Sequence, residues 1–190
     1  MKALEEKILS EGKILPGNIL KVGSFLNQQI DVEFLMQMGE EAARLFADAG
    51  VTRVLTVEAS GIAIAVGVAA AMHVPAVFAK KHQTSNLSGD VYRSVVHSYT
   101  HNTDYTIVVP CDYIRPGDKV LLADDFLANG QALNGLIDIV GQAGAEVAGA
   151  LIAIEKGFQG GGDKLREKGI RVESLALIDS MDDTGIVFRR

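Results

Sequence analysis

The sequence predicts an α/β fold in which a twisted, mostly parallel sheet is flanked by helices. Short apolar runs, of the kind that strands buried on both faces have, alternate along the chain with segments whose apolar residues recur at helical spacing. The chain has 190 residues and shows no internal repeat or low-complexity linker. We therefore expect residues 1–190 to form a single domain with a sizeable core.

Composition and charge argue against several classes of partner. No window approaches the roughly 20 continuous apolar residues of a membrane span, so we expect no membrane partner. The net charge of −6 argues against nonspecific binding of nucleic acid, which depends on basic surfaces. The single cysteine, Cys111, cannot form an internal disulfide, and Glu5 and Glu6 stand where a signal peptide has an uncharged run. Both features favour a cytoplasmic protein.

The N-terminal region is expected to contain a short helix, an extended segment and a longer helix. An apolar stripe at helical spacing stops near Gly12. In residues 18–27, apolar and polar residues alternate loosely, and the segment ends in a polar loop. Asp31 is a plausible N-cap for the longer helix, which Gly50 closes.

The first strand–turn–helix unit follows. Residues 53–57 form a buried-strand candidate, Glu58-Ala59-Ser60-Gly61 a tight polar turn, and residues 62–72 a helix rich in small residues. Backbone amides of such a turn can bind an anion, although a plain strand–helix connection explains the residues about as well. The next strand, 75–79, ends at Lys80-Lys81, where positive charge suits a phosphorylated ligand. Taken alone, paired lysines at a strand end are more often a solvated edge.

A β-hairpin is predicted in the middle of the chain. Residues 91–99 and 105–109 are β-rich runs around a polar turn, and a polar segment over 83–89 precedes them. The histidines here share no metal-ligand spacing with cysteines or carboxylates, so we expect no zinc site.

The stretch from Val120 to Leu133 carries the strongest functional signal. An apolar run ends in two adjacent carboxylates, Asp124 and Asp125, and a helical pattern begins at Leu133. Small and flexible residues lie between them: Ala128, Asn129, Gly130, Gln131 and Ala132. A strand that opens through such a turn into a helix presents backbone N–H groups that suit a phosphate, and the carboxylates suit sugar hydroxyls or Mg²⁺. The residues alone leave open an ordinary strand–loop–helix unit with a capping carboxylate.

The C-terminal part is predicted to add a buried strand and a last strand to the sheet. Residues 147–154 form the buried strand, which delivers Glu155 and Lys156 at its end. Residues 159–162 are expected to be a flexible turn, and residues 171–178 the last strand, followed by an acidic tail.

The segment from Asp124 to Ala132 resembles the ribose-phosphate binding signature of type I phosphoribosyltransferases. The amino-acid sequence of this segment is most similar to that of the bacterial xanthine phosphoribosyltransferases. The commoner loop of the family has Thr-Gly-Gly-Thr where this chain has Asn129-Gly130-Gln131-Ala132. Two hydroxyls are thereby lost, so backbone amides and the Asn129 side chain are expected to hold more of the phosphate.

The resemblance implies transfer of the phosphoribosyl group of phosphoribosyl pyrophosphate to xanthine, which gives xanthosine 5′-monophosphate and pyrophosphate in purine salvage. It implies an N-terminal hood, about residues 1–30 plus a C-terminal segment, and a flexible hairpin lid that excludes water. It also implies a homodimer. Mg²⁺ would arrive with the pyrophosphate, so no residue is expected to bind a metal directly.

The resemblance assigns roles to individual residues. The catalytic carboxylates would be Asp124 and Asp125. The residues that bind phosphoribosyl pyrophosphate would be Ala128, Asn129, Gly130, Gln131, Ala132, Ser60, Gly61 and Lys81. The residues that bind xanthine would be Leu20, Asn27 and Lys156, although the sequence fits a core leucine at 20 and a turn residue at 27 equally well.

Two other functions remain open at this point. An adenine phosphoribosyltransferase is compatible with the hood and with Ala128, but the Lys156 ammonium cannot accept a hydrogen bond from the amino group of adenine. A regulator could keep the fold in order to sense phosphoribosyl pyrophosphate without turning it over. Such regulators carry a DNA-binding module, for which 190 residues leave no room.

Overall fold

The computed structural model describes residues 1–82, 90–98, 103–182 and 184–189. Its helices are α1 (Lys2–Glu11), α2 (Val32–Leu45), α3 (Gly61–Met72), α4 (Gln131–Gln142) and α5 (Gly161–Glu167). Its strands are β1 (Lys13–Leu15), β2 (Ile19–Lys21), β3 (Arg53–Val57), β4 (Ala76–His82), β5 (Val91–Ser98), β6 (Thr103–Pro110), β7 (Lys119–Leu127), β8 (Glu146–Lys156), β9 (Val172–Asp182) and β10 (Gly185–Phe188). Single helical turns lie at Gly23–Asn27, Cys111–Tyr113 and Gly157–Gln159, the first of them π-helical.

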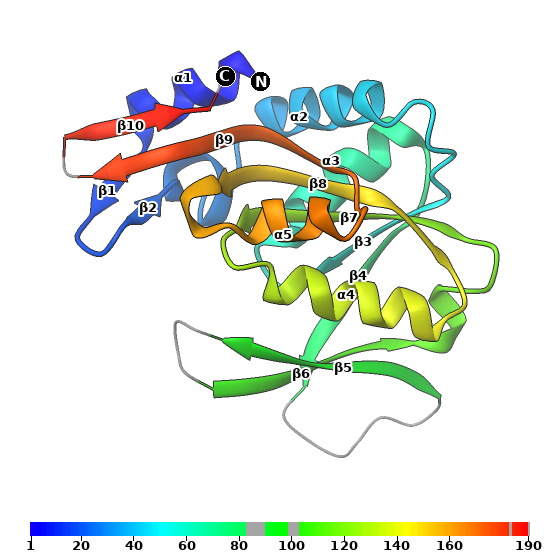
Figure 1. The fold of residues 1–190 in the computed structure, drawn as a ribbon. Helices are drawn as coiled ribbons and strands as arrows, with labels where there is room; N and C mark the ends of the chain where they lie inside the picture. Colours follow the sequence, from blue (N-terminus) through cyan, green and yellow to red (C-terminus); the bar gives the residue numbers. More distant parts are fainter. Residues whose placement is uncertain (83–89, 99–102, 183, 190) are drawn as a thin grey trace.

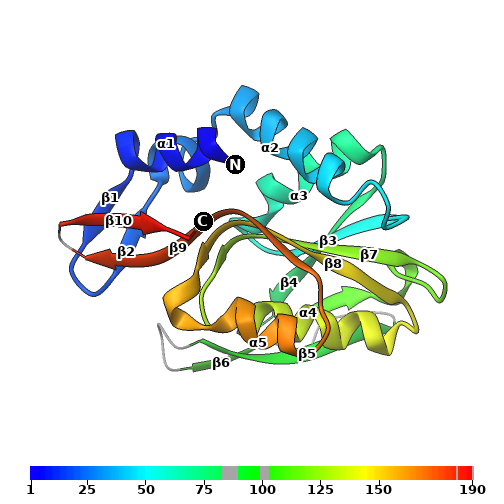
Figure 2. The same ribbon diagram turned by 45° about the horizontal axis from the view of Figure 1, so that its top comes forward.

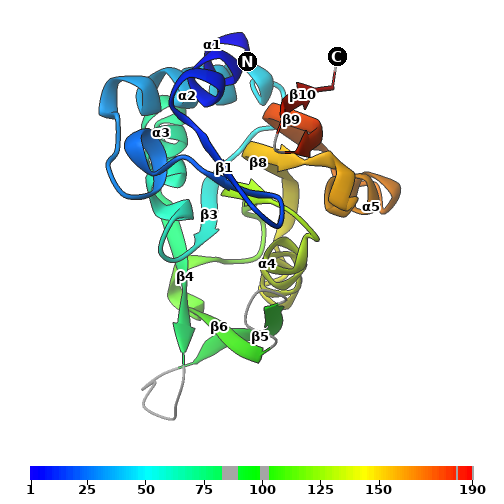
Figure 3. The same ribbon diagram turned by 90° about the vertical axis from the view of Figure 1, so that its left-hand side faces the viewer.

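The main sheet has eight strands in the order β10-β9-β8-β7-β3-β4-β6-β5. Its central strands, from β9 to β4, are parallel, and antiparallel strands flank them at both edges. Helices α2 and α3 cover one face of the sheet, and α4 and α5 lie on the other (Figures 1 and 3). These features confirm the predicted α/β fold with a mostly parallel sheet flanked by helices.

Strand β7 lies in the centre of the sheet because its side chains are apolar on both faces of the sheet. Leu121 and Ala123 belong to the core under α2 and α3, while Val120 and Leu122 belong to the core under α4. The sequence predicted that the strand ends at the acidic pair, and this prediction was wrong. The strand continues to Leu127, which pairs with β8, so both aspartates lie within a strand.

The N-terminal segment and the C-terminal strands lie side by side (Figure 2). Helix α1 packs against β9, and the amino group of Met1 donates to the carbonyl oxygen of Leu175. Lys7 on α1 forms ion pairs with Glu11 at 3.0 Å and with Asp31 at 2.9 Å. These contacts fix α1 against the start of α2 and beside the π-helical turn.

Asp31 is the N-cap of α2, as predicted. Its Oδ1 accepts a hydrogen bond from the backbone N–H of Phe34 at 3.1 Å. The helix ends at Leu45, earlier than the predicted end at Gly50, which follows the turn of residues 46–49 and has a φ of +63°.

Strands β5 and β6 form the predicted hairpin, paired from Val91 opposite Pro110 to Ser98 opposite Thr103. The polar segment 83–89 and the turn residues 99–102 lie outside the described residues. The role of this hairpin as a flexible lid therefore stays a prediction.

The C-terminal end differs from the expected acidic tail. Strand β9 continues to Asp182, and β10 pairs back onto it, with Gly185 opposite Asp182. The polar residues around this turn hid the edge hairpin, because an edge strand exposes one side of its backbone and needs few apolar residues. None of the helices in the described part of the chain has the length and apolar character to cross a membrane.

Candidate active site

The acidic pair lies on the central strand of the sheet and is largely shielded from water. Asp124 is 7% exposed and Asp125 6% exposed, in a strand bordered by β3 and β8. The backbone N–H of Asp125 donates to Oδ1 of Asp124 at 3.0 Å. Within the described residues, no lysine or arginine forms an ion pair with either carboxylate. Two adjacent acidic groups are therefore held in the protein without a matched cation.

Asp125 accepts hydrogen bonds from two distant segments. The amide nitrogen of Asn27 donates to Oδ2 at 2.9 Å, and the hydroxyl of Ser60 donates to Oδ1 at 2.9 Å. Asn27 ends the π-helical turn, and Ser60 is the N-cap residue of α3. The Asp125 carboxylate, to which the resemblance gives a role at the ribose, thus contacts one residue expected at the base and one expected at the pyrophosphate.

Asp124 has an unusual electrostatic environment. Burial raises the pKa of its carboxyl well above the usual value, and the negative charge of Asp125 raises it further. The positive charge of Lys81 partly offsets this effect on the Asp124 pKa. The free protein therefore disfavours a full negative charge at this position, and a cation placed beside it would be strongly attracted.

Gly61 lets the first turn of α3 approach the acidic pair. A Cβ atom at this position would lie 2.1 Å from Oγ1 of Thr56 and 2.9 Å from Oδ1 of Asp124. A side chain at 61 is thus sterically excluded, and the N-terminus of a helix of 12 residues faces the aspartate. The positive end of a helix dipole and unpaired backbone N–H groups favour an anion there.

The loop after β7 leads directly into α4. Gly130 has a φ of +80° and forms the N-cap, and the backbone N–H of Asn134 makes the first helical hydrogen bond, to the Gly130 carbonyl at 2.9 Å. The helix begins at Gln131, two residues before the predicted start at Leu133. The N–H groups of its first turn have no partner within the helix, so residues 130–133 present donors to an anion. Asn129 is exposed beside them.

Lys81 lies on β4 close enough to Asp124 for its positive charge to lower the pKa of that carboxyl. Its Nζ is 5.3 Å from the ring centre of Tyr105, and its backbone N–H donates to Oε1 of Glu58 at 2.6 Å. Burial raises the pKa of the Tyr105 hydroxyl, and the negative charge of Asp124 raises it further. Sequence reasoning missed Tyr105, because an aromatic residue in a predicted hairpin strand carries no signal of a site.

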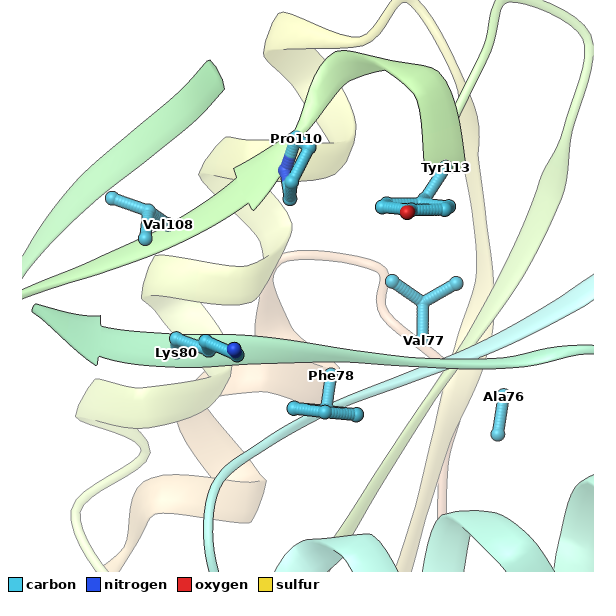
Figure 4. Close-up of a pocket in the computed structure, with 7 residues that line it drawn as sticks. All are labelled: Ala76, Val77, Phe78, Lys80, Val108, Pro110 and Tyr113. Carbon is cyan, nitrogen blue, oxygen red and sulfur yellow. The ribbon is translucent and has the colours of Figure 1, made fainter. Parts of the chain in front are cut away.

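Lys80 faces the opposite side of β4 from Lys81, since neighbouring side chains in a strand alternate. It lines a cavity of about 380 Å³ that is otherwise mostly apolar (Figure 4). The lining residues are Ala76, Val77, Phe78, Lys80, Val108, Pro110 and Tyr113. None of the residues assigned to the reaction lines this cavity.

Lys156, at the end of β8, faces the N-terminal segment. Its Nζ donates to the carbonyl oxygen of Asn18 at 3.0 Å and lies 5.6 Å from the ring centre of Phe126. Partial burial lowers the pKa of its ammonium. Leu20 is 6% exposed and belongs to the core under α2, so its side chain has a structural contact whether or not it meets a base.

The chain's similarity to known proteins agrees with this arrangement. The family model described as Phosphoribosyl transferase domain matches residues 28–177. The chain belongs to the phosphoribosyltransferase family. Xanthine phosphoribosyltransferase of Limosilactobacillus reuteri is 50% identical to it over 188 residues, covering 99% of this chain and 98% of the relative. Xanthine phosphoribosyltransferase 1 of Clostridium perfringens is 52% identical over 191 residues, covering 100% of both. The predicted family is thereby confirmed.

Solved phosphoribosyltransferase structures share the fold. Adenine phosphoribosyltransferase of Giardia lamblia, in complex with 9-deazaadenine, superposes with a TM-score of 0.77 at 23% identity, covering 92% of this chain and 96% of that one. The adenine phosphoribosyltransferase of Trypanosoma brucei has a TM-score of 0.77 at 16% identity, covering 96% and 82% of the two chains. At these low identities, the likeness between these structures and this phosphoribosyltransferase concerns only the fold.

The structure also shows a third buried acidic residue, Glu155, in the described part of this phosphoribosyltransferase. Glu155 is 0% exposed, and the guanidinium of Arg166 donates to both of its carboxylate oxygens, at 2.8 and 2.7 Å. Sequence reasoning placed Glu155 at a strand end beside Lys156 and found no partner for it. No group of three or more potential metal-binding side chains occurs in the part of the chain that the structure describes.

Proposed function

We propose that this phosphoribosyltransferase transfers the 5-phosphoribosyl group from phosphoribosyl pyrophosphate to xanthine, releasing xanthosine 5′-monophosphate and pyrophosphate. One structural observation carries the proposal: the carboxylate of Asp125 accepts hydrogen bonds from both Asn27 and Ser60. The groups for the base, the ribose and the pyrophosphate therefore converge on a single point. Relatives about 50% identical over the full chain, which bear the name xanthine phosphoribosyltransferase, support the choice of acceptor.

The acidic pair supplies the rate acceleration. As the bond from the ribose to pyrophosphate lengthens, positive charge develops on the sugar ring. Asp124 and Asp125 stabilise this charge more in the transition state than in the ground state, and such a difference accelerates a reaction. Because burial and the neighbouring negative charge disfavour the ionised form of Asp124 in the free protein, a cationic ribose relieves an existing electrostatic cost.

The 5′-phosphate and the pyrophosphate of the substrate bind at two different helix N-termini. The 5′-phosphate accepts hydrogen bonds from the loop of residues 128–132 at the start of α4, where Asn129 adds an exposed side chain. The pyrophosphate accepts from the turn at Ser60 and Gly61 and pairs with Lys81. Mg²⁺ accompanies the pyrophosphate, whose oxygens are the hard ligands that this ion prefers.

The base lies between the π-helical turn and Lys156. Because a carboxylate only accepts hydrogen bonds, the NH₂ group of Asn27 faces Asp125, and its carbonyl oxygen remains available to a ring N–H of the base. Lys156 donates to an exocyclic oxygen in place of its contact with Asn18. Leu20 contributes an apolar surface. An oxo-purine provides both a ring N–H and an oxygen acceptor, whereas adenine has no exocyclic oxygen.

Pyrophosphate release tests this proposal. The protein is mixed with phosphoribosyl pyrophosphate, Mg²⁺ and one purine at a time: xanthine, guanine, hypoxanthine or adenine. We expect the largest kcat/KM with xanthine. No pyrophosphate should be released after Mg²⁺ is removed with a chelator. Release with adenine alone would support an adenine phosphoribosyltransferase, and tight binding without any release would support a sensor. The variant Asp138→Asn, which changes an exposed carboxylate on α4, is the matched control.

A homodimer and a cytoplasmic location complete the proposal. The homodimer comes from the family resemblance alone, and the cytoplasmic location is favoured by the single cysteine, Cys111. Light scattering on the purified protein tests the first, since a homodimer has twice the mass of the 20.2 kDa chain.

A further inference from the structure

Three consecutive glycines, Gly160 to Gly162, lie at the start of α5, and the middle one packs against the loop that follows β7. The sequence predicted a flexible turn at 159–162. The structure instead places Gly161 in backbone contact with the loop, where its N–H donates to the carbonyl oxygen of Ala128 at 3.0 Å. Both Gly161 and Gly162 are buried.

Gly161 fits against the loop only because it has no side chain. A Cβ atom would lie 2.2 Å from the Ala128 carbonyl oxygen, 2.7 Å from the Asn129 carbonyl carbon and 2.8 Å from the Gly130 nitrogen. All three atoms belong to the backbone, so no side-chain rotation can relieve the clash. Any larger residue at 161 must displace the loop or α5.

The glycine turn is itself held by the buried ion pair. Glu155 receives hydrogen bonds from both terminal nitrogens of the Arg166 guanidinium, and the hydroxyl of Ser174 also donates to it. A Cβ atom on Gly162 would lie 2.0 Å from Oε1 of Glu155. The second and third glycines therefore allow α5 to touch the loop on one side and the ion pair on the other.

Gly160 has a different reason to be glycine. Its φ of +72° lies in the left-handed region, and a Cβ atom there would meet nothing within 4 Å. A substitution at 160 strains the backbone of the turn without touching the loop. The chain thus contains its own control for the contact at Gly161.

We propose that Gly161 is a positioning residue for the 5′-phosphate, which sets the place of loop residues 128–130 and hence of the N–H donors at the start of α4. The Glu155–Arg166 pair holds Gly161 in that position. This inference rests on the proposed function, namely that the loop binds the phosphate monoester of a ribose 5-phosphate. Displacing such donors by about 1 Å can reduce binding or catalysis by up to 100-fold.

The experiment compares Gly161→Ala with Gly160→Ala. For each variant the KM values for phosphoribosyl pyrophosphate and xanthine are measured, together with the Kd for ribose 5-phosphate by calorimetry. We expect Gly161→Ala to raise the KM for phosphoribosyl pyrophosphate and the Kd for ribose 5-phosphate by at least about 10-fold, with the KM for xanthine changed by less than about twofold. Gly160→Ala should leave all three constants within about twofold and lower only the melting temperature.

Two further results keep the outcome decisive. If Gly161→Ala does not fold, Arg166→Lys is measured in its place. A lysine keeps the positive charge of the buried pair but cannot make the bidentate contact with Glu155. We expect the same selective rise in the KM for phosphoribosyl pyrophosphate. Equal constants for Gly161→Ala and Gly160→Ala, or a parallel rise in both KM values, would overturn the inference. Should the wild-type protein bind ribose 5-phosphate but release no pyrophosphate, the proposed reaction fails, while weaker binding in Gly161→Ala still supports the positioning role.

Discussion

Two buried acidic residues on neighbouring strands illustrate the difference between a structural and a functional charge. Glu155 on β8 is fully buried, and its oxygens are matched by the Arg166 guanidinium and the Ser174 hydroxyl. Asp124 on β7 is 7% exposed and lies beside a second carboxylate, and it forms no ion pair with a lysine or arginine in the described part of the chain. Burial alone thus does not identify a functional residue. What distinguishes Asp124 is a buried carboxyl whose charged form has no matched cation in the described part of the chain.

The comparison predicts opposite consequences for the two residues. Removing the partner of Glu155 should damage the fold and raise the KM for phosphoribosyl pyrophosphate, but leave kcat at saturating substrate largely unchanged. Neutralising an aspartate of the pair should damage the chemistry and spare the fold. Each variant below tests one side of this contrast.

The largest expected effect is on stability, in Arg166→Met. This change leaves the Glu155 carboxylate buried without its cation, and breaking a buried pair in this way typically costs about 3–5 kcal/mol. Urea unfolding measures the loss, and kcat should change by less than about threefold at saturating substrate because no reacting atom touches the pair. Arg44→Met, which removes an exposed pair with Glu41, is the control and should leave the unfolding midpoint nearly unchanged. A stable Arg166→Met protein with greatly reduced kcat would reverse the assignment.

The next effect is on turnover, in Asp125→Asn. The amide removes a charge beside the ribose and places an NH₂ group opposite a hydrogen-bond donor, Asn27 or Ser60. Loss of one oriented charged group at a reacting centre costs about 3–4 kcal/mol of barrier, so kcat should fall by about 100-fold to 1,000-fold. The melting temperature should change by no more than about 4 °C. A large fall in melting temperature with turnover intact would show that Asp125 is structural, like Glu155.

A smaller effect is expected on base binding, in Lys156→Ala. A hydrogen bond from a charged donor contributes about 1.5–3 kcal/mol, so the KM for xanthine should rise by about 10-fold to 100-fold. The KM for phosphoribosyl pyrophosphate should change little, and Lys164→Ala, an exposed lysine on α5, is the control. Because burial lowers the pKa of Lys156, wild-type xanthine binding should also weaken as the pH rises through a value below 10.5. Equal changes in both KM values would remove Lys156 from the base site.

Much of the fold could be predicted from local patterns in the sequence. Apolar runs located the central strands, and Asp31 marked the start of α2 because a capping side chain satisfies a nearby N–H. The closeness of Ser60 to Asp125 could also be anticipated, since the carboxyl ends of parallel strands meet at one edge of a sheet.

The rest depended on contacts that no local pattern encodes. The partner of Glu155 lies on the next helix, and three glycines in a row look the same in a flexible turn as in a close backbone contact. The hydrogen bond from Asn27 to Asp125 joins residues 98 positions apart. The extra length of β7 came from pairing with β8, which keeps both aspartates inside the sheet.

Asp124→Asn tests the central claim most directly, through its melting temperature and kcat measured between about pH 4 and pH 8. Because the folded protein raises the pKa of Asp124, the wild-type protein is stabilised below the ordinary value of 3.8 and loses that stability as the pH rises through the folded pKa. The variant carries no charge there, so it should melt at a higher temperature than the wild type at neutral pH, with a gap that closes in acid. Its kcat should fall by at least about 100-fold. A variant that melts at a lower temperature and keeps its turnover would contradict the account.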